Sequence, residues 1–340
     1  MARILIVGGG GYIGVVLAET LLRAGESVTL LDRFFFGREL VTPLSALGQF
    51  AVVRDDSRSV TPKHFEGFDA VVDLAGLSND PSCDLDPALT EAINIGGAAN
   101  VARCARKAGV ARLVYSSSCS VYGQGEGTAS EDSQTRPVSL YARTKLAAEG
   151  EVLSLSDETL HVTALRNATV YGVSPRMRFD LLVNLMTLFA FERGRIFVLG
   201  GGEQWRPLVH VRDVARAFLL VLRSSVTDVA AQVINIGSDR QNHQVSSVAS
   251  LIARLIPRTV IEAVPDDPDK RSYRVDFARA RKLLGFEPEY DVVDGIREVL
   301  EALQDRRVDQ GIRSRTVEFY RYLIEADRVV REVSYRGRIL

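Results

Sequence analysis

A tyrosine and a lysine stand four residues apart, at Tyr141 and Lys145. On an α-helix this spacing places both side chains on one face, one turn apart. A lysine ammonium beside a phenol stabilises the phenolate, so we expect Lys145 to lower the pKa of Tyr141 from about 10 toward the range of a general base. Such a pair could take a proton from an alcohol. The spacing alone is also typical of an ordinary amphipathic helix, so its meaning depends on the rest of the chain.

Upstream, an apolar run that begins at Val114 passes into a series of serines and ends in a loop at Gly123. A serine hydroxyl at the end of a strand could complete the hydrogen bonding to the alcohol or carbonyl oxygen on which Tyr141 acts. Together, the serines, the tyrosine and the lysine predict proton transfer at an oxygen of the substrate.

A glycine-rich turn follows the first apolar run, where Ile4–Val7 leads into Gly8 and on to Gly14, and a helical pattern follows. This order of strand, turn and helix is the context that a dinucleotide-binding loop requires. Gly8 permits the tight turn, Gly11 lets the backbone approach a pyrophosphate, and Gly14 allows the helix to pack closely on the strand. The first N–H groups of the helix would face the pyrophosphate.

Asp32 ends the second predicted strand, where a carboxylate can accept hydrogen bonds from both hydroxyls of the adenosine ribose. It would repel a 2′-phosphate, so the sequence favours NAD over NADP. Arg33 follows directly and would soften that preference. The cation of a bound nicotinamide would add to Lys145 in stabilising the phenolate of Tyr141.

Short apolar runs alternate with helical patterns in the first half of the chain, which is typical of a parallel sheet with crossover helices. We expect an open, doubly wound α/β sheet of the Rossmann type, formed by residues 1–172 and 206–237. Residues 173–205 and 238–304 carry more Pro, Gly and charge and are predicted to form a smaller, discontinuous substrate lobe, followed by an Arg-rich helical tail over 305–340. The predicted strands are Arg3–Val7, Ser27–Leu31, Phe50–Arg54, Ala70–Leu74, Arg112–Ser116, His161–Arg166 and Val233–Ile236, and the predicted helices are Gly14–Ala24, Asp86–Ala108, Tyr141–Leu155, Val211–Leu222 and Glu318–Arg331.

The composition of the 340 residues excludes several classes of protein. The net charge of −1 offers no general attraction for nucleic acid or for an anionic membrane. No apolar stretch approaches the ~20 residues of a membrane span. The three cysteines form no CxxC pair and the four histidines show no metal-ligand spacing, so we expect reduced thiols and no metal site. A cytoplasmic enzyme fits these observations.

The chain resembles the extended short-chain dehydrogenases/reductases of the nucleotide-sugar epimerase and dehydratase group, from Ile4 to about Val299. The resemblance rests on the glycine loop, Asp32, the Tyr141/Lys145 pair and a series of short motifs. These motifs are Leu74-Ala75-Gly76, Asn94-Ile95-Gly96-Gly97, Val121-Tyr122-Gly123, Leu165-Arg166, Val170-Tyr171-Gly172, Arg206 with His210, Asp213-Val214-Ala215, Asn235-Ile236-Gly237 and Leu284-Gly285-Phe286.

The resemblance implies a role for each matching position. Ser118 matches the catalytic Ser/Thr, Tyr141 the base, and Lys145 its partner, which also holds the nicotinamide ribose. Asp55 or Asp56 matches the acid that binds adenine. The implied NAD site comprises Gly8, Gly11, Tyr12, Ile13, Gly14, Asp32, Arg33, Asp55, Asp56, Leu74, Ala75, Gly76, Asn94, Ser116, Tyr141 and Lys145.

The substrate implied by the resemblance is a nucleotide-diphosphate sugar, whose diphosphate Arg206 would grip with its guanidinium. Arg176 and Arg178, on an unusual segment, could contact a phosphate or a branch of the sugar, and Trp205 could stack on the base. The implied substrate site comprises Ser78, Ser118, Cys119, Ser120, Tyr141, Thr169, Arg176, Arg178, Asn184, Trp205, Arg206 and Arg271.

Two positions after Ser118 separate this chain from several relatives. The 4,6-dehydratases of the family carry an Asp–Glu pair there, and the decarboxylating members a Glu at the second position. Here the two positions hold Cys119 and Ser120. The 3,5-epimerising members carry a Cys at the second position, so Cys119 lies one residue early and is more typical of a small buried residue. The chemistry that remains is C4 epimerisation through a transient 4-keto sugar.

Two alternatives stay open: a nucleotide-sugar ketoreductase or dehydrogenase that uses the same Ser118, Tyr141 and Lys145, and a non-catalytic NAD-binding protein. Relatives dimerise through two helices in each subunit, which here would be Asp86–Ala108 and Tyr141–Leu155. We therefore expect a homodimer. The residues expected at its contact are Ala92, Ile95, Ala99, Ala102, Ala105, Arg106, Leu146, Leu153 and Leu155.

Overall fold

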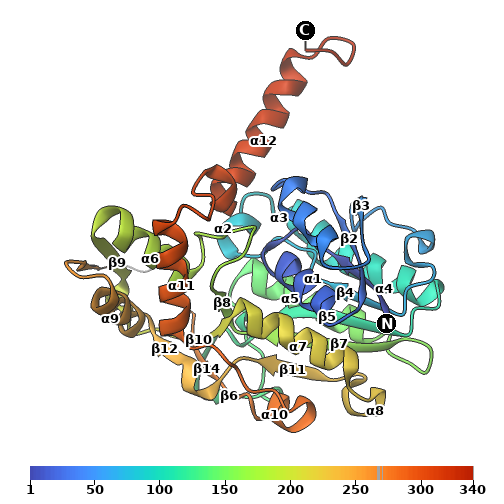
Figure 1. Ribbon diagram of the computed structural model, residues 1–340, viewed down its shortest axis with the longest axis horizontal. Coiled ribbons are helices and arrows are strands. Elements are labelled where there is room, and N and C mark those ends of the chain that lie inside the picture. Colours follow the sequence, from blue (N-terminus) through green and yellow to red (C-terminus); the bar gives the residue numbers. More distant parts are fainter. Residues whose placement is uncertain (266–268, 270, 340) are drawn as a thin grey trace.

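The computed structural model describes residues 1–265, 269 and 271–339. Its centre is a parallel sheet in the order β11-β7-β5-β4-β1-β2-β3 (Figure 1). Strand β1 pairs with both β2 and β4, so the strand order reverses there, and ligands of such sheets bind at the carboxyl ends of the strands beside this point. The predicted α/β class is confirmed. The strands of the sheet are β1 (Arg3–Val7), β2 (Ser27–Asp32), β3 (Phe50–Arg54), β4 (Ala70–Asp73), β5 (Arg112–Ser118), β7 (His161–Asn167) and β11 (Val233–Ile236).

Successive side chains of a strand point to opposite faces of the sheet, and β1 shows the result. Ile4 and Ile6 belong to one buried core, whereas Leu5 and Val7 belong to another. Helices cover both faces, which explains why these strands are nearly continuous apolar runs. The covering helices are α1 (Tyr12–Arg23) and α7 (Val211–Arg223) on the first face, and α4 (Ala98–Lys107) and α5 (Leu140–Leu153) on the second.

The helix expected over Asp86–Ala108 contains a change of geometry. It consists of α3 (Pro87–Glu91), a π-helical turn η3 (Ala92–Gly97) and α4. The expectation that its alanines face another subunit is partly wrong, because Ala102 and Ala105 are fully buried against the subunit's own sheet. The outer face of this helix instead presents the exposed Ala92 and Gly96.

A smaller lobe has its own apolar core, to which six elements contribute residues: β8, α6, β9, β10, α9 and α11. The short strands outside the central sheet form three further sheets, in the orders β12-β10-β8, β13-β9 and β14-β6. The elements not yet given are β6 (Gln124–Ala129), β8 (Thr169–Tyr171), β9 (Arg195–Leu199), β10 (Trp205–His210), β12 (Asn242–Gln244), β13 (Val260–Val264), β14 (Ser272–Val275), α2 (Asp80–Cys83), α6 (Leu182–Arg193), α8 (Val226–Val229), α9 (Val245–Leu255), α10 (Ala278–Leu284), α11 (Val292–Gln304), α12 (Thr316–Val333) and the short 3₁₀ helices η1 (Arg38–Ala46), η2 (Pro62–Phe65), η4 (Cys119–Tyr122), η5 (Gly200–Gly202), η6 (Asp239–Gln241) and η7 (Ile312–Ser314).

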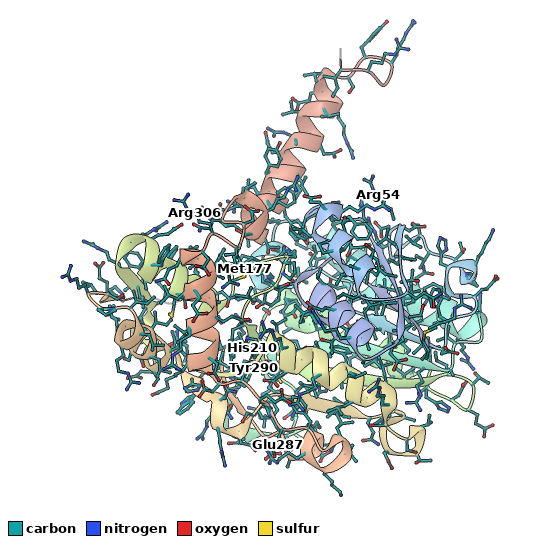
Figure 2. All side chains as sticks on the ribbon, viewed as in Figure 1. Arg54, Met177, His210, Glu287, Tyr290 and Arg306 are labelled. Atoms are coloured by element: carbon teal, nitrogen blue, oxygen red, sulfur yellow. The ribbon has the colours of Figure 1, made fainter. Side chains whose placement is uncertain are left out.

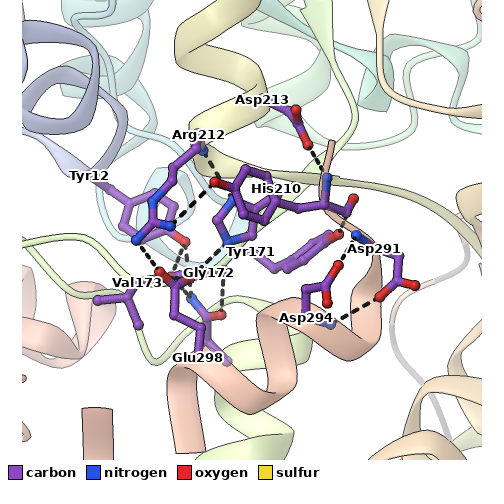
Figure 3. A network of polar contacts seen from close by, with 12 residues as sticks. Tyr12, Tyr171, Gly172, Val173, His210, Arg212, Asp213, Asp291, Asp294 and Glu298 are labelled. Atoms are coloured by element: carbon purple, nitrogen blue, oxygen red, sulfur yellow. Dashed lines mark hydrogen bonds and ion pairs between the residues drawn. The ribbon is translucent and has the colours of Figure 1, made fainter. Parts of the chain in front are cut away.

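A polar network around His210 joins β10 and α7 to α11 (Figure 3). The His210 ring is fully buried, its Nε2 lies 2.8 Å from a Glu298 carboxylate oxygen, and it stacks on Tyr290 with 4.4 Å between ring centroids. Glu298 also accepts a hydrogen bond of 3.1 Å from the backbone N–H of Val173. Because these residues lie on β10, α11 and the loop after β8, His210 has a structural place away from the carboxyl ends of the sheet strands.

The last helix, α12, projects from the body of the molecule (Figure 1). Its buried residues, Thr316 and Phe319, lie in its first turns. Within the described residues, no helix has the length and apolarity needed to cross a membrane.

Candidate active site

A cavity of about 650 Å³ opens at the carboxyl ends of β1, β4, β5 and β7. Its size is in the range of ligand-binding sites. Most of the residues that the sequence places in the cofactor and substrate sites line it together. They are Gly8, Gly11, Tyr12, Ile13, Gly14, Asp32, Arg33, Asp55, Asp56, Leu74, Ala75, Gly76, Ser78, Ser116, Ser118, Ser120, Tyr141, Lys145, Thr169, Arg176, Arg178, Arg206 and Arg271.

The glycine loop has the tight geometry that a dinucleotide needs. Gly8 has φ of +77°, and a Cβ added there would lie 2.7 Å from the backbone nitrogen of Ala75. A Cβ on Gly14 would lie 2.6 Å from the carbonyl oxygen of Gly9. Neither position accepts a side chain, so the loop folds closely onto β4 and onto itself, and the N-terminus of α1 opens into the cavity. The donors and the shape fit the pyrophosphate of NAD.

Asp32 is held in place by the backbone. Its Oδ2 accepts a hydrogen bond of 3.0 Å from the N–H of Gly10, and its Oδ1 accepts one of 2.7 Å from the N–H of Phe34. Burial raises the pKa of this carboxyl group, and the two backbone donors oppose the rise. The carboxylate is thus fixed at the end of β2, as expected for an acceptor of ribose hydroxyls.

Arg33 does not turn toward Asp32. Its guanidinium lies 3.2 Å from Asp56 and stacks over the Phe35 ring, 4.4 Å from the centroid. Asp56 also pairs with Arg58 at 2.6 Å, and these arginine contacts lower the pKa of Asp56 to about 2. Arg33 is therefore engaged with Asp56 and does not contribute a free cation at the ribose.

The proposed proton-transfer group comes from two elements, with Ser118 at the end of β5 and Tyr141 with Lys145 on α5. Burial raises the pKa of Tyr141 to about 12, and the hydrogen bond with Ser118 opposes the rise. Burial also lowers the pKa of Lys145 to about 8. Burial therefore opposes the lowering of the Tyr141 pKa that is expected from Lys145 and a bound nicotinamide cation.

A buried ion pair supports α5 from behind. Glu149, one turn after Lys145, accepts hydrogen bonds from the Arg166 guanidinium at 2.6 and 3.0 Å and from the Ser117 hydroxyl at 2.6 Å. The guanidinium of Arg166 also donates to the Tyr122 hydroxyl at 3.0 Å. This network fixes the end of β5 against α5, so it sets the position of Ser118 relative to Tyr141.

Cys119 belongs to this supporting layer and not to the cavity. It is 1% exposed, its Sγ lies 3.1 Å from the carbonyl oxygen of Arg166, and burial raises the pKa of its thiol. A catalytic role for the thiol is not supported, because it is neither ionised nor open to a ligand. Ser120, the next residue, does line the cavity.

Three further residues expected at the ligands do not line the cavity. Asn94 holds the loop after β4, because it bonds both backbone groups of Leu77 at 2.8 and 3.1 Å and the Thr144 hydroxyl at 3.0 Å. Asn184 is fully buried and bonds the Tyr12 hydroxyl at 3.2 Å. Trp205 packs its ring under the guanidinium of Arg274. All three are corrected to positioning or packing roles.

Charged residues cluster at the lobe side of the cavity. Asp269 pairs with Arg206 at 2.8 Å and with Arg271 at 2.6 Å, and Arg271 pairs with Asp80 at 2.7 Å. The two arginines were identified from the sequence, but the two aspartates were not, because nothing in the spacing indicates that Asp80 and Asp269 both pair with Arg271. Two guanidinium groups held side by side can bind a diphosphate.

A second charged cluster lies on the loop before α6. Arg178 is 7% exposed, pairs with Asp180 at 2.7 Å and donates to the Ser78 hydroxyl at 2.9 Å. The positive charge of Arg178 acts to lower the pKa of Tyr141. Six further lining residues follow Asp32 or lie far along the chain and were not predicted from the sequence: Phe35, Phe36, Asp180, Tyr273, Val317 and Tyr320.

The sequence and the structure were compared with known proteins. The model of the NAD dependent epimerase/dehydratase family matches residues 4–237. Among curated proteins, UDP-glucuronic acid decarboxylase 1 of Xenopus tropicalis is 28% identical over 88% of this chain and 71% of its own length. UDP-glucose 4-epimerase of Lactobacillus helveticus is 27% identical over 86% and 94%. The solved structure of MoeE5 in complex with UDP-glucuronic acid and NAD matches with a TM-score of 0.79 and 30% identity, and covers 89% of this chain and 99% of that one.

Proposed function

Because the chain belongs to the NAD-dependent epimerase/dehydratase family, we propose that it inverts C4 of a nucleotide-activated sugar through a transient 4-keto sugar. The observation that carries this choice is the wall of the cavity after Ser118, where Ser120 stands and no carboxylate follows. Elimination or decarboxylation would need an acid or base at that place, whereas epimerisation at C4 needs only the proton relay.

The proton relay consists of Ser118, Tyr141 and Lys145. Ser118 holds the oxygen on C4, and the phenolate of Tyr141 takes the proton of that hydroxyl; the phenol so formed later returns the proton to the 4-keto oxygen. Bound NAD would supply the hydride chemistry at C4, and its nicotinamide cation would favour the phenolate of Tyr141. The positive charge of Lys145 would act in the same direction, whereas burial raises the pKa of this tyrosine.

Two other carboxylates that line the cavity are engaged in ion pairs. Asp80 is paired with Arg271 and Asp180 with Arg178. A carboxylate beside a guanidinium is a poor base, because the pair stabilises its ionised form. This supports inversion at C4 over removal of the C5 proton.

The arginines at the lobe side supply a place for the nucleotide. Arg206 and Arg271 are bridged by Asp269, which keeps the two guanidinium groups together before a ligand arrives. We assign the diphosphate of the substrate to them. The sugar would then lie between this cluster and Tyr141.

The test is incubation of the purified chain with nucleotide sugars in D₂O, starting with UDP-glucose and UDP-glucuronic acid and continuing with GDP-, CDP- and dTDP-sugars. We expect one substrate to reach a mixture with its C4 epimer from either side, with unchanged mass and no deuterium at C5. No added reduced cofactor should be needed.

Each rival reaction leaves its own mark in the same experiment. Dehydration lowers the mass by one water, decarboxylation releases CO₂, exchange at C5 introduces deuterium, and a ketoreductase consumes added NADH or NADPH. Any of these as the main product, with no C4 epimer, would overturn the proposal.

A further inference from the structure

The segment Ile312–Tyr320, which we call the C-terminal clasp, lies outside the residues that match the family model, yet it forms part of the cavity wall. It consists of η7 and the first turns of α12. Its residues Val317 and Tyr320 line the cavity together with Asp32 and the glycine loop. A segment outside the residues matched by the family model thus contributes to the wall of the cavity beside Asp32.

Buried hydrogen bonds fix the clasp to the loop before α6. The carbonyl oxygen of Ser314 accepts from the N–H of Phe179 at 2.8 Å. The Thr316 hydroxyl accepts from the Arg176 guanidinium at 2.9 Å and donates to the Asp180 carboxylate at 3.1 Å. Ser314 and Thr316 are 2% and 1% exposed, so these bonds lie away from solvent. Met177, within the same loop, is also inside the body of the molecule (Figure 2).

Aromatic contacts fix the clasp to the loop after β2. The ring of Phe36 lies 5.5 Å from that of Phe319 and 5.7 Å from that of Tyr320, between centroids. The guanidinium of Arg176 stacks on the same Phe36 ring, 3.6 Å from its centroid. Three segments that are distant in the sequence therefore meet around one arginine.

Arg176 is a buried cation that lacks a carboxylate partner at ion-pair distance among the described residues. It is 3% exposed, and its Nε and Nη1 have no hydrogen-bond partner there. Burial, followed by the charge of Arg178, lowers the pKa of Arg176 to about 10. Because a buried charge without an ion-pair partner is costly, the surroundings of Arg176 favour the binding of an anion. The positive charge of Arg176 interacts electrostatically with Asp32 and with Tyr12, which places the guanidinium near the glycine loop.

We propose that the C-terminal clasp retains NAD: Thr316 holds Arg176 toward the cofactor's diphosphate, and Tyr320 with Val317 closes the cavity beside Asp32. This changes the expected role of Arg176 from the substrate to the cofactor. The inference rests on the NAD site alone and not on the reaction proposed above.

The test compares NAD release from Tyr320→Ala and Arg176→Met with that from the matched control Tyr322→Ala. Tyr322 lies on the same helix, but it is 57% exposed and does not line the cavity. NAD per subunit is measured after purification, and the release rate of bound NAD is followed during dialysis against cofactor-free buffer. We expect release to be at least 10-fold faster in the first two variants, several-fold faster in Thr316→Val, and unchanged in Tyr322→Ala.

The proposal is overturned if the wild-type protein holds no NAD, or if Tyr320→Ala and Arg176→Met release NAD at the wild-type rate. It is also overturned if Tyr322→Ala releases NAD as fast as these two variants do. Thermal melting of each apoprotein identifies a variant that has not folded, and Thr316→Val then provides the comparison. Because the readout is bound NAD, a wrong choice of sugar or reaction leaves the result unaffected.

Discussion

The ammonium of Lys145 lies 4.2 Å from the centroid of the Tyr115 ring. Tyr115 is fully buried on β5, so this cation–π contact takes place inside the protein, where it is stronger than at the surface. The negative charges of Asp73, at the end of β4, and of Glu149 also act to raise the pKa of Lys145. These contacts keep the lysine protonated in a place where burial favours its neutral form.

The pH dependence of turnover should show this balance between burial, which lowers the pKa of Lys145, and the neighbouring carboxylates, which raise it. The pKa of Lys145 is lowered to about 8, so the fraction of enzyme with a charged ammonium falls as the pH rises through 8. We expect kcat to fall there as well. Asp73→Asn removes a charge that raises the lysine pKa, so it should move the falling limb to lower pH. Glu158 is exposed in the loop after α5, so Glu158→Gln should leave the falling limb at the same pH. A limb that is identical in all three proteins would contradict this assignment.

Tyr141→Phe should abolish proton transfer and leave the fold intact, because the ring still fills its place. We expect kcat to fall by about 10² or more while NAD remains bound. Single-turnover assays together with NAD content separate the two effects. Near-normal turnover in Tyr141→Phe would exclude the phenol as the base.

Asp32→Ala should weaken NAD binding and reduce the discrimination against NADP, since the ribose hydroxyls lose their charged acceptor. Arg33→Ala is the matched control, because Arg33 is half exposed and engaged with Asp56. Titration of apoprotein with both cofactors measures the two affinities. A wild type that prefers NADP, or an Arg33→Ala variant with the larger change in preference, would show that Asp32 has been misassigned.

The outer faces of η3 and α5 predict a two-fold homodimer. Small exposed residues, Ala92, Gly96, Ala147 and Gly150, allow helices of two subunits to approach closely. Light scattering at micromolar concentration should give twice the 37.3 kDa of one chain. Ala147→Arg should shift the mass toward the monomer, whereas Ser250→Arg, on the exposed side of α9, should not. A monomeric wild type would refute the dimer.

The sequence was sufficient for most features that depend on local pattern. Every strand predicted for the central sheet forms. The inner strands could be recognised because strands covered on both faces are largely apolar, whereas the edge strand β3 is partly exposed. The glycine loop and Asp32 were identified for a similar reason: a turn that approaches a pyrophosphate requires glycine, and the acidic residue follows at a fixed spacing.

The features that the sequence did not reveal depend on tertiary contacts. Cys119 follows a residue that lines the cavity, and only the direction of its side chain, toward the Arg166 carbonyl, removes it from the site. The pKa of Tyr141 depends on burial by elements that no spacing records. The bond between Arg176 and Thr316 joins residues 140 positions apart. No local pattern indicates that the tail returns to the glycine loop.

The place of Tyr320 in the chain has a consequence for synthesis on the ribosome. Folding during translation starts from the N-terminal part of a chain. The glycine loop, Asp32 and Arg176 all emerge before Tyr320, so the part of the cavity wall that Tyr320 forms is synthesised last. If the C-terminal clasp retains NAD as proposed, loading of NAD is expected to be easiest before this segment has folded.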